Sequence, residues 1–426
     1  MTGSSIDVEA VDRAIEADAE RAFAFLERLV AEPSVVGAEA GAQAVMAEEL
    51  ERLGFAVEHL PIPEDIARHE GAGIPLLPYE GRDDVVGSQG PDGGRSLLLG
   101  GHIDVVPPSE PDLWTSGPFV PVRHDGWLYG RGSGDMKGGL AMISLTIDAL
   151  RLAAPDAIAG PLHFLSAIEE ECTGNGALAA CLAGQRADAV VLTEPTGLDL
   201  LLAGVGILWL EITIVGKAAH AQSANVAVNP IDTAIPLIGA LRTMERQMNE
   251  NMNDPALGEA DHPYNVNIGA MRAGDWASSV PALARLDVRI GHPTAWTASE
   301  ALQRVSAVLD HAAREDPWLR DHPPQVRPSG FRAQGHALDP QHPLALALAD
   351  AHESTHGTRP KAYGLGSTTD ARYYLNQFDT PALCYGPTAR NIHGVDEAVE
   401  LRSIVEGART LARFIASWYA NTDAVP

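Results

Sequence analysis

The sequence predicts an α/β protein in which a discontinuous, mainly parallel-sheet catalytic domain carries an inserted, smaller α+β domain. Three observations predict this architecture. The first half of the chain contains continuous apolar runs separated by helical segments, the pattern of strands buried on both faces of a parallel sheet. An alternating segment begins near Gly204, and buried-type segments resume after a Pro-rich break at 322–328. At 426 residues, the chain is also too long for one ordinary hydrophobic core.

The first half supplies the sheet and its covering helices. Residues 8–30 place apolar side chains at helical spacing before Pro33, which predicts an opening amphipathic helix. Continuous apolar runs at 96–106, 162–168 and 189–192 predict buried strands, and 139–152 predicts a helix between them. Because sites in open α/β sheets lie at the carboxyl ends of the strands, we expect functional residues there.

The inserted unit begins with 207–215 (ILWLEITIV), which alternates so that Trp209 and Glu211 share one face. This pattern predicts a half-exposed strand of an antiparallel sheet. The unit continues with segments that predict a helix, two strands and a second helix: 231–248, 265–272, 282–290 and 302–309. The catalytic domain then resumes with a strand at 382–385 and a helix at 401–418. We therefore expect domain limits of 1–202, 203–328 and 329–426.

Composition restricts the location and the partners of the protein. No apolar run is long enough to cross a bilayer, and the acidic N-terminus lacks the features of a signal peptide. Three cysteines form no disulfide framework, so we expect a cytoplasmic protein without a membrane partner. The net charge of -27 argues against nucleic acid. A generally acidic surface explains most of this charge, but part of it suits carboxylates that hold cations.

The first chemical motif is GGHIDVVP, in which an apolar strand ends with His102 and Asp104. Side chains two apart on a strand point the same way, so the pair suits a metal ligand and a supporting carboxylate. Asp104 would nevertheless need a bend in the strand to reach the far ring nitrogen. The alternative is a buried histidine that is hydrogen-bonded at the end of a strand.

The second and third motifs also follow strands or Gly-rich turns. In GRGSGDMKGGL, glycines surround Asp135, and the spacing fits neither a P-loop nor a dinucleotide fingerprint. A turn capped by Asp135 is the alternative. In AIEEECTGNG, three consecutive carboxylates follow a strand, where one can bind a metal while another moves protons. A glutamate run is otherwise typical of a solvated helix face.

The remaining motifs are VVLTEPTG, with Glu194 at the end of a strand, and NIHGVDE, with His393 in a loop. Each alone is equally consistent with a turn or a surface loop. Together, His102, Asp135, Glu171, Glu194 and His393 form a set of two imidazoles and three carboxylates. Such a set suits two zinc ions that share a carboxylate.

From about residue 20 onward the chain resembles a family of zinc amidohydrolases that includes acetylornithine deacetylase, succinyl-diaminopimelate desuccinylase, aminoacylase-1 and bacterial carboxypeptidase G. The resemblance rests on the ordered motifs GHIDVVP, GRGSGDMKGG, EEECTGNG, TEPT, GKAAHA, GSTTDAR and HGVDE. It implies hydrolysis of a small amide that carries a carboxylate, with an N-acyl amino acid as the leading substrate class. A dipeptidase or carboxypeptidase would use the same metal site, and a non-catalytic scaffold is a further alternative.

The resemblance also implies roles for individual residues. Asp135 would bridge two zinc ions, with His102 and Glu194 completing one site and Glu171 and His393 the other. Cobalt or manganese suits the same ligands. The resemblance further implies that Glu170 is the general base and that the carboxylate of Asp104 supports His102 from behind. It implies that His220 donates to the oxyanion, often across a dimer interface. It also implies a cis peptide between Asp135 and Met136.

Two arginines are candidates for the substrate carboxylate. Arg289 ends the segment ARLDVRI and Arg372 follows GSTTDA, and each guanidinium can offer a bidentate fork, although a surface ion pair explains either one singly. The chain departs from many relatives at Ser278–Ser279, where asparagine is common, and at Glu169, where aspartate is common. We also expect a homodimer through the inserted domain, because 207–215 with Trp209 resembles an edge strand that pairs with its twin.

Overall fold

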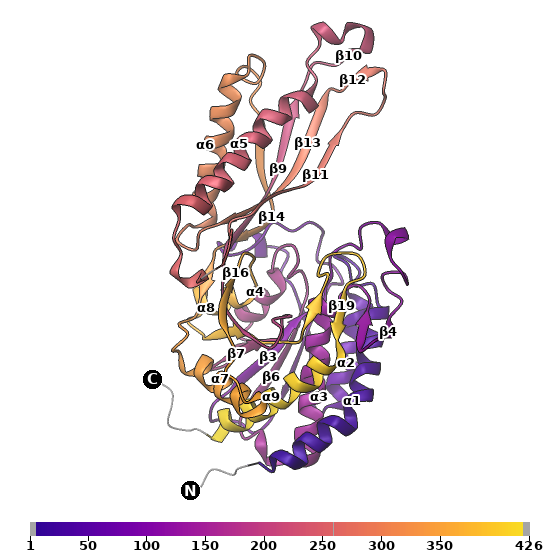
Figure 1. Cartoon of the computed structure of the whole chain (residues 1–426), viewed down its shortest axis with the longest axis vertical. Helices are drawn as coiled ribbons and strands as arrows, with labels where there is room; N and C mark the ends of the chain where they lie inside the picture. The colour runs from indigo at the N-terminus through magenta and orange to yellow at the C-terminus, as the bar shows by residue number, and fades with distance from the viewer. Residues whose placement is uncertain (1–5, 259, 421–426) are drawn as a thin grey trace.

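The computed structural model describes residues 6–258 and 260–420, which form two structural units (Figure 1). The larger unit is built on a nine-stranded sheet, and the smaller one on a four-stranded antiparallel sheet. The chain leaves the larger unit after β8 (Leu200–Gly204) and returns to it with β15 (His336–Ala337), which pairs with β8. The smaller unit, called the insert below, therefore interrupts the larger one.

The nine-stranded sheet has the order β1-β2-β6-β3-β7-β17-β8-β15, with β16 pairing to β8. Its other strands are β1 (Ala56–Pro61), β2 (Asp83–Gln89), β3 (Leu97–His102), β6 (Leu162–Ala167), β7 (Val190–Leu192), β16 (Ala362–Leu365) and β17 (Ala382–Cys384). The central strands β6, β3, β7 and β17 run parallel, and β1, β2 and β15 join antiparallel at the edges. The predicted parallel strands are confirmed, and their carboxyl ends meet at one edge.

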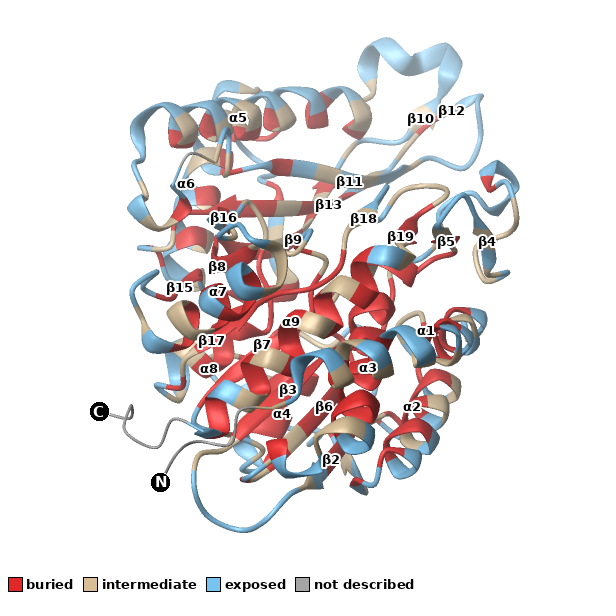
Figure 2. Ribbon diagram, turned by 60° about the horizontal axis from the view of Figure 1, so that its bottom comes forward, coloured by how far each residue is buried: buried red, intermediate tan, exposed pale blue. Residues whose placement is uncertain are grey.

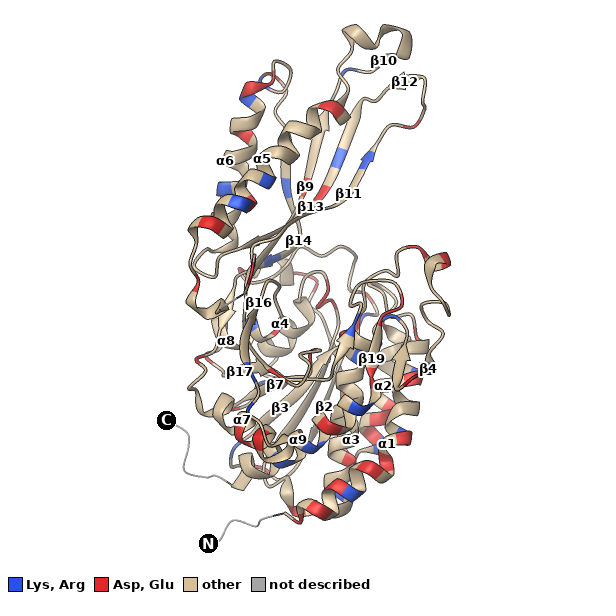
Figure 3. Cartoon of the chain, viewed as in Figure 1, with Lys and Arg blue, Asp and Glu red and all other residues tan. Residues whose placement is uncertain are grey.

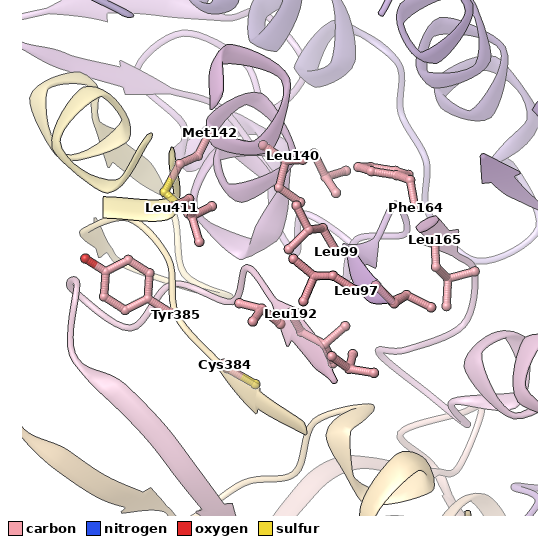
Figure 4. Packing of buried hydrophobic residues seen from close by; sticks show 14 of the residues in the cluster. Leu97, Leu99, Leu140, Met142, Phe164, Leu165, Leu192, Cys384, Tyr385 and Leu411 are labelled. Carbon is pink, nitrogen blue, oxygen red and sulfur yellow. The ribbon is translucent and has the colours of Figure 1, made fainter. Parts of the chain in front are cut away.

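The apolar runs form strands because both of their faces are covered. Every residue of β3 is buried, and Figure 4 shows Leu97 and Leu99 among side chains from neighbouring strands and helices. The helices of this unit are α1 (Val8–Ala31), α2 (Ala40–Arg52), α3 (Gly138–Ala153), α4 (Asn175–Leu182), α7 (Pro343–His356), α8 (Ala371–Gln377) and α9 (Leu401–Ala420). α3 packs between α1 and α9, and the buried residues concentrate in the sheet and these helices (Figure 2).

The outer helices carry much of the charge. Acidic residues recur along α1 and α2 (Figure 3), and several pair with arginines of adjacent helices, as Glu49 does with Arg21 and Arg52. Among the described residues, no helix is both long and apolar enough to cross a bilayer.

The insert contains β9 (Gly206–Val215), β11 (Val266–Ala273), β13 (Leu283–His292) and β14 (Gln325–Ala333), in the order β11-β13-β9-β14. Two helices, α5 (Pro230–Asn251) and α6 (Ala298–Glu315), pack on this sheet. β9 alternates between buried and half-buried side chains, so the half-exposed strand predicted there is confirmed. A separate pair, β10 (Ala219–His220) and β12 (Ser279–Val280), lies at the far end of the insert (Figure 1).

The expectation that 207–215 is an edge strand is wrong. β9 lies between β13 and β14, and the edge strands of this sheet are β11 and β14. β14 pairs with β9 although more than a hundred residues separate them, and local patterning carries no signal for such a distant partner. The same strand continues to Ala333, so the sheet of the insert extends past residue 328.

A small four-stranded sheet brings two distant loops together. It consists of β4 (Val122–His124), β5 (Trp127–Tyr129), β18 (Ala389–Arg390) and β19 (Ala398–Glu400). The pairing of β5 with β19 places the loop that precedes α3 beside the loop that joins β18 to β19. These loops carry Asp135 and His393, respectively.

Candidate active site

The five residues predicted as metal ligands come together in the structure. Nε2 of His102 lies 3.0 Å from Oδ1 of Asp135, and Nε2 of His393 lies 3.4 Å from Oδ2 of the same carboxylate. Glu171 Oε1 is 3.1 Å from His393 Nε2, and Glu194 Oε2 is 3.9 Å from His102 Nε2. Asp135 therefore lies between the two histidines and directs one oxygen toward each.

The parallel sheet explains why the ligands converge. His102 ends β3, Glu171 follows β6 and Glu194 follows β7, and these three strands are parallel neighbours. Asp135 and His393 reach the same edge from the two loops joined by the small sheet. The Asp135–Met136 peptide is cis, as the resemblance implies.

The environment of His102 leaves one ring nitrogen for a cation. Nδ1 lies 2.9 Å from the carbonyl oxygen of Asp104, so Nδ1 carries the proton and donates it, and Nε2 keeps its lone pair. The carboxylate of Asp104 is 3.7 Å from Nδ1, too far for a hydrogen bond. It instead accepts the backbone N–H groups of Glu170 and Glu171, at 3.1 and 3.2 Å. The carbonyl thus supports the ring, and the carboxylate holds the glutamate pair.

The buried carboxyl groups at this site favour the binding of cations. Burial raises the pKa of the Glu194 carboxyl to about 8 and that of Asp104 to about 7, and neighbouring carboxylates add to both shifts. Burial likewise raises the pKa of Glu170. Burial would also raise the pKa of Asp135, but hydrogen bonds from His102 and His393 hold it below its ordinary range.

The donor chemistry fits a divalent metal. His102, Asp135 and Glu171 each offer a ligand atom within 4.8 Å of the others, and imidazole nitrogens with carboxylate oxygens are typical ligands of zinc and related metals. Divalent cations would also compensate the buried carboxylates, because a buried charge without a partner is costly.

Two buried glutamates that were not predicted as site residues hold the ligand loops. Glu397, at the end of the motif that carries His393, accepts the backbone N–H groups of Gly134 and Asp135, both at 3.0 Å. Its other oxygen pairs with Arg131. The signal available in the sequence was its position in the HGVDE motif.

Glu169 is the second such residue, and its backbone takes a positive φ of 63°. Its carboxylate accepts hydrogen bonds from Arg82 Nη1 (2.8 Å), the Tyr79 hydroxyl (2.6 Å) and the Thr173 hydroxyl (2.7 Å). These three bonds hold a conformation that non-glycine residues seldom adopt. The departure from aspartate at this position was the only signal in the sequence.

We expect Glu169→Gln to lower the melting temperature by several degrees. Arg82 is buried against Glu169, and removing the charge of one partner of a buried ion pair costs about 3–5 kcal/mol. Differential scanning fluorimetry measures the shift. Glu16→Gln is the matched control, because Glu16 makes its ion pairs with Arg402 and Arg409 at the surface. Equal melting temperatures for the two variants would show that the buried pair stabilises nothing.

Of the two candidate arginines, only Arg289 faces the site. It lines a cavity of about 450 Å³ together with Glu170, Glu171 and His393. Its Nη2 donates to the carbonyl of Gly366 at 3.1 Å, and no carboxylate offsets its burial, which lowers its pKa. Arg289 is therefore a partly buried cation that an anionic ligand would stabilise.

Arg372 lies behind the cavity and does not line it. Its guanidinium is buried and donates to the backbone carbonyls of Thr369 (2.9 Å) and Thr173 (3.2 Å). Nη1 is 4.0 Å from Glu170 Oε1. The structure thus places Arg372 beside the predicted base, with Nη1 and Nη2 bonded within the protein, rather than in the cavity.

His220 does not join the other site residues within the chain. It lies on β10, exposed, at the end of the insert that points away from the nine-stranded sheet (Figure 1).

The fold and the site together define a metallohydrolase. The model of peptidase family M20/M25/M40 matches residues 98–417. Succinyl-diaminopimelate desuccinylase of Methylorubrum extorquens is 31% identical over 406 residues, which cover 90% of this chain and 94% of that protein. The chain belongs to peptidase family M20/M25/M40. It is a metal-dependent hydrolase of linear amides, so the resemblance noted in the sequence is confirmed.

Solved structures share the fold at low sequence identity. A di-peptidase from Saccharomyces cerevisiae gives a TM-score of 0.79 at 17% identity, with 97% of this chain and 98% of that chain covered. A dinuclear metal binding peptidase of the M20 family from Bacillus subtilis gives a TM-score of 0.58 at 17% identity, with 95% and 99% covered.

Proposed function

We propose that this protein is a dizinc deacylase of N-acyl amino acids. The observation that carries the proposal is the position of Asp135, whose two carboxylate oxygens face His102 and His393 separately, next to a cavity whose fixed cation is Arg289. One ion would be held by His102 and Glu194, the other by Glu171 and His393, and both by Asp135. Cobalt or manganese would fit the same ligands.

Bound metal ions would polarise the amide carbonyl and lower the pKa of a water molecule toward neutrality. The chain itself supplies the proton transfer. Glu170 lines the cavity, and burial raises its pKa, which suits a group that takes a proton from water and returns it to the leaving amine. Asp104 fixes the backbone of this glutamate by accepting its N–H.

Arg289 would hold the carboxylate of the substrate. Its interactions with Gly366 and Ser367 both involve Nη2, which leaves Nη1 to donate a charge-assisted hydrogen bond to the carboxylate. We expect Arg289→Met to raise the KM for N-acetyl-L-alanine about 10–100-fold, since a hydrogen bond to a charged group contributes about 1.5–3 kcal/mol.

Steady-state kinetics of N-acetyl-L-alanine and N-acetyl-L-alaninamide test this role. The amide lacks the carboxylate, so its KM should be the same for Arg289→Met and the parent protein. Arg289→Lys keeps the charge without the fork and should give an intermediate KM. An equal effect on both substrates would assign Arg289 a structural role.

The insert would act as a lid and a dimerisation domain, with limits near those expected from the sequence. The support is the exposed position of His220 on β10, remote from the ligands of its own chain. A twofold partner could bring this imidazole to the site as a donor to the oxyanion. Sedimentation that gives a monomer at assay concentrations would contradict both roles. The three unpaired, buried cysteines support a reducing compartment, for which we propose the cytoplasm.

A panel of N-acetyl and N-succinyl amino acids and dipeptides, incubated with zinc-loaded protein, tests the proposed activity. Hydrolysis of dipeptides alone would favour the alternative of a dipeptidase, the activity named for the structural relative from Saccharomyces cerevisiae. Hydrolysis of no amide would favour a scaffold that has kept the site without turnover.

A further inference from the structure

One wall of the cavity is apolar and lies next to Arg289. It consists of Leu76, Val106, Trp209 and Phe331, with buried aliphatic side chains of β9 and β13 beneath them. Trp209 is the cross-strand neighbour of Arg289. Side chains of directly paired residues lie side by side on the same face of a sheet, so an apolar surface begins where the substrate carboxylate would bind.

Trp209 is held in one orientation. Its ring meets the ring of Phe331 edge-on, with 5.3 Å between the centroids. It also lies against Gly330, where a Cβ atom would come within 2.5 Å of the indole. Gly330 has a φ of +60°, so both its conformation and its missing side chain make room for the ring. The wall is therefore rigid before any ligand binds.

Leu76 extends this wall on a loop that is fixed at several points. The backbone N–H of Ile74 donates to the carbonyl of Gly330 at 2.7 Å, and farther along the loop Tyr79 and Arg82 bind Glu169. Leu76 nevertheless remains 44% exposed. Because Leu76 lines the same cavity as Trp209, an apolar ligand there would cover its exposed side chain and gain free energy.

The charges of the cavity limit the ligand to one carboxylate. Arg289 is the only arginine or lysine among the described residues that line it. The remaining acidic side chain, Asp287, already pairs with Arg272 and would repel a second carboxylate. A ligand with several carboxylates therefore lacks partners here.

We propose that the preferred substrates are N-acyl α-amino acids whose own side chain is aromatic or branched aliphatic and uncharged. This inference rests on the proposed deacylase activity and deepens it. With the α-carboxylate on Arg289, the amino acid side chain lies on Trp209, Phe331 and Leu76, and the acyl carbonyl points toward the metal ligands. Succinyl-diaminopimelate, with its several carboxylates, would be a poor substrate.

The test compares kcat/KM for four substrates of the zinc-loaded protein. We expect N-acetyl-L-phenylalanine to exceed N-acetyl-L-alanine, N-acetyl-L-aspartate and N-succinyl-L,L-diaminopimelate about tenfold or more, because burying a large apolar group contributes about 1.5–3 kcal/mol. Equal or faster hydrolysis of the alanine or acidic substrates would overturn the inference and leave the deacylase activity standing.

Variants test whether the wall causes the preference. Trp209→Ala should lower the ratio of phenylalanine to alanine kcat/KM about 10–100-fold. Leu76→Ala, at an exposed site that cannot disrupt the core, should lower it several-fold. Trp276→Ala is the matched control, since Trp276 is 71% exposed and does not line the cavity. An unchanged ratio in Trp209→Ala and Leu76→Ala would contradict the role of the wall.

A binding measurement separates the inference from the proposed activity. Calorimetry on zinc-loaded Glu170→Gln should show N-acetyl-L-phenylalanine binding about tenfold more tightly than N-acetyl-L-alanine. If no substrate is hydrolysed but this difference is observed, the proposed activity fails and the apolar wall stands. If the two ligands bind equally, the wall fails whatever the activity.

Discussion

Glu170→Gln is expected to lower kcat about 10²–10⁴-fold while leaving the metal content unchanged. Glutamine has the size of glutamate but cannot accept a proton from water, so the variant removes general base catalysis alone. The side chain is not among the predicted ligands, and its backbone is held by the carboxylate of Asp104, which the substitution does not touch. Steady-state kinetics and elemental analysis of the same preparation measure the two quantities.

Two further variants provide the comparison and the control for Glu170→Gln. Glu171→Gln alters the adjacent predicted ligand, 3.1 Å from His393 in the structure, and should lose metal as well as activity. Glu58→Gln changes an exposed glutamate of β1 and should lose neither. Glu170→Gln with more than a tenth of the parent kcat, or with reduced metal content, would contradict the division of roles between the two neighbouring glutamates.

Asp135→Ala is expected to have the second large effect, a metal content that falls from about two ions per chain to below one. The two oxygens of Asp135 face different histidines, at 3.0 and 3.4 Å, so one substitution weakens both ion sites. The activity should fall with the metal. Elemental analysis after dialysis against buffered zinc measures the loss.

The melting temperature of Asp135→Ala tests metal binding independently of elemental analysis. Metal binding to the folded state raises the melting temperature by mass action, so the parent protein should melt higher with zinc than with a chelator, and Asp135→Ala should show little difference. Asp92→Ala, in an exposed loop between β2 and β3, is the control and should behave as the parent does. Full metal content in Asp135→Ala would place the shared ligand elsewhere.

The convergence of the predicted ligands could be expected from the sequence because it follows a local rule. Each of His102, Glu171 and Glu194 lies at or within three residues of the end of a continuous apolar run, and such runs become parallel strands whose ends meet. Asp135 and His393 were found from their motifs, but their proximity depends on the pairing of β5 with β19. That contact joins residues some 270 positions apart, and nothing in either segment specifies the other.

The two candidate arginines show a different limit of prediction from sequence. Arg289 and Arg372 both follow motifs and carry the same charge, so the sequence offers no means of ranking them. In the structure, Nη1 and Nη2 of Arg372 donate to backbone carbonyls away from the cavity, whereas Arg289 faces the cavity. Whether a guanidinium remains free for a ligand depends on groups brought to it from other elements.

By itself, the sequence determined the central buried strands, five of the helices, the five convergent residues and the half-exposed character of β9. Hydrophobic periodicity and residue chemistry are local properties, so they can be recognised from a single sequence. Only the tertiary structure decided that β9 is an interior strand, that a carbonyl rather than the carboxylate of Asp104 supports His102, and that Trp209 faces the cavity beside Arg289. Each depends on partners distant in sequence or on a bend of the backbone, which packing of the whole chain selects.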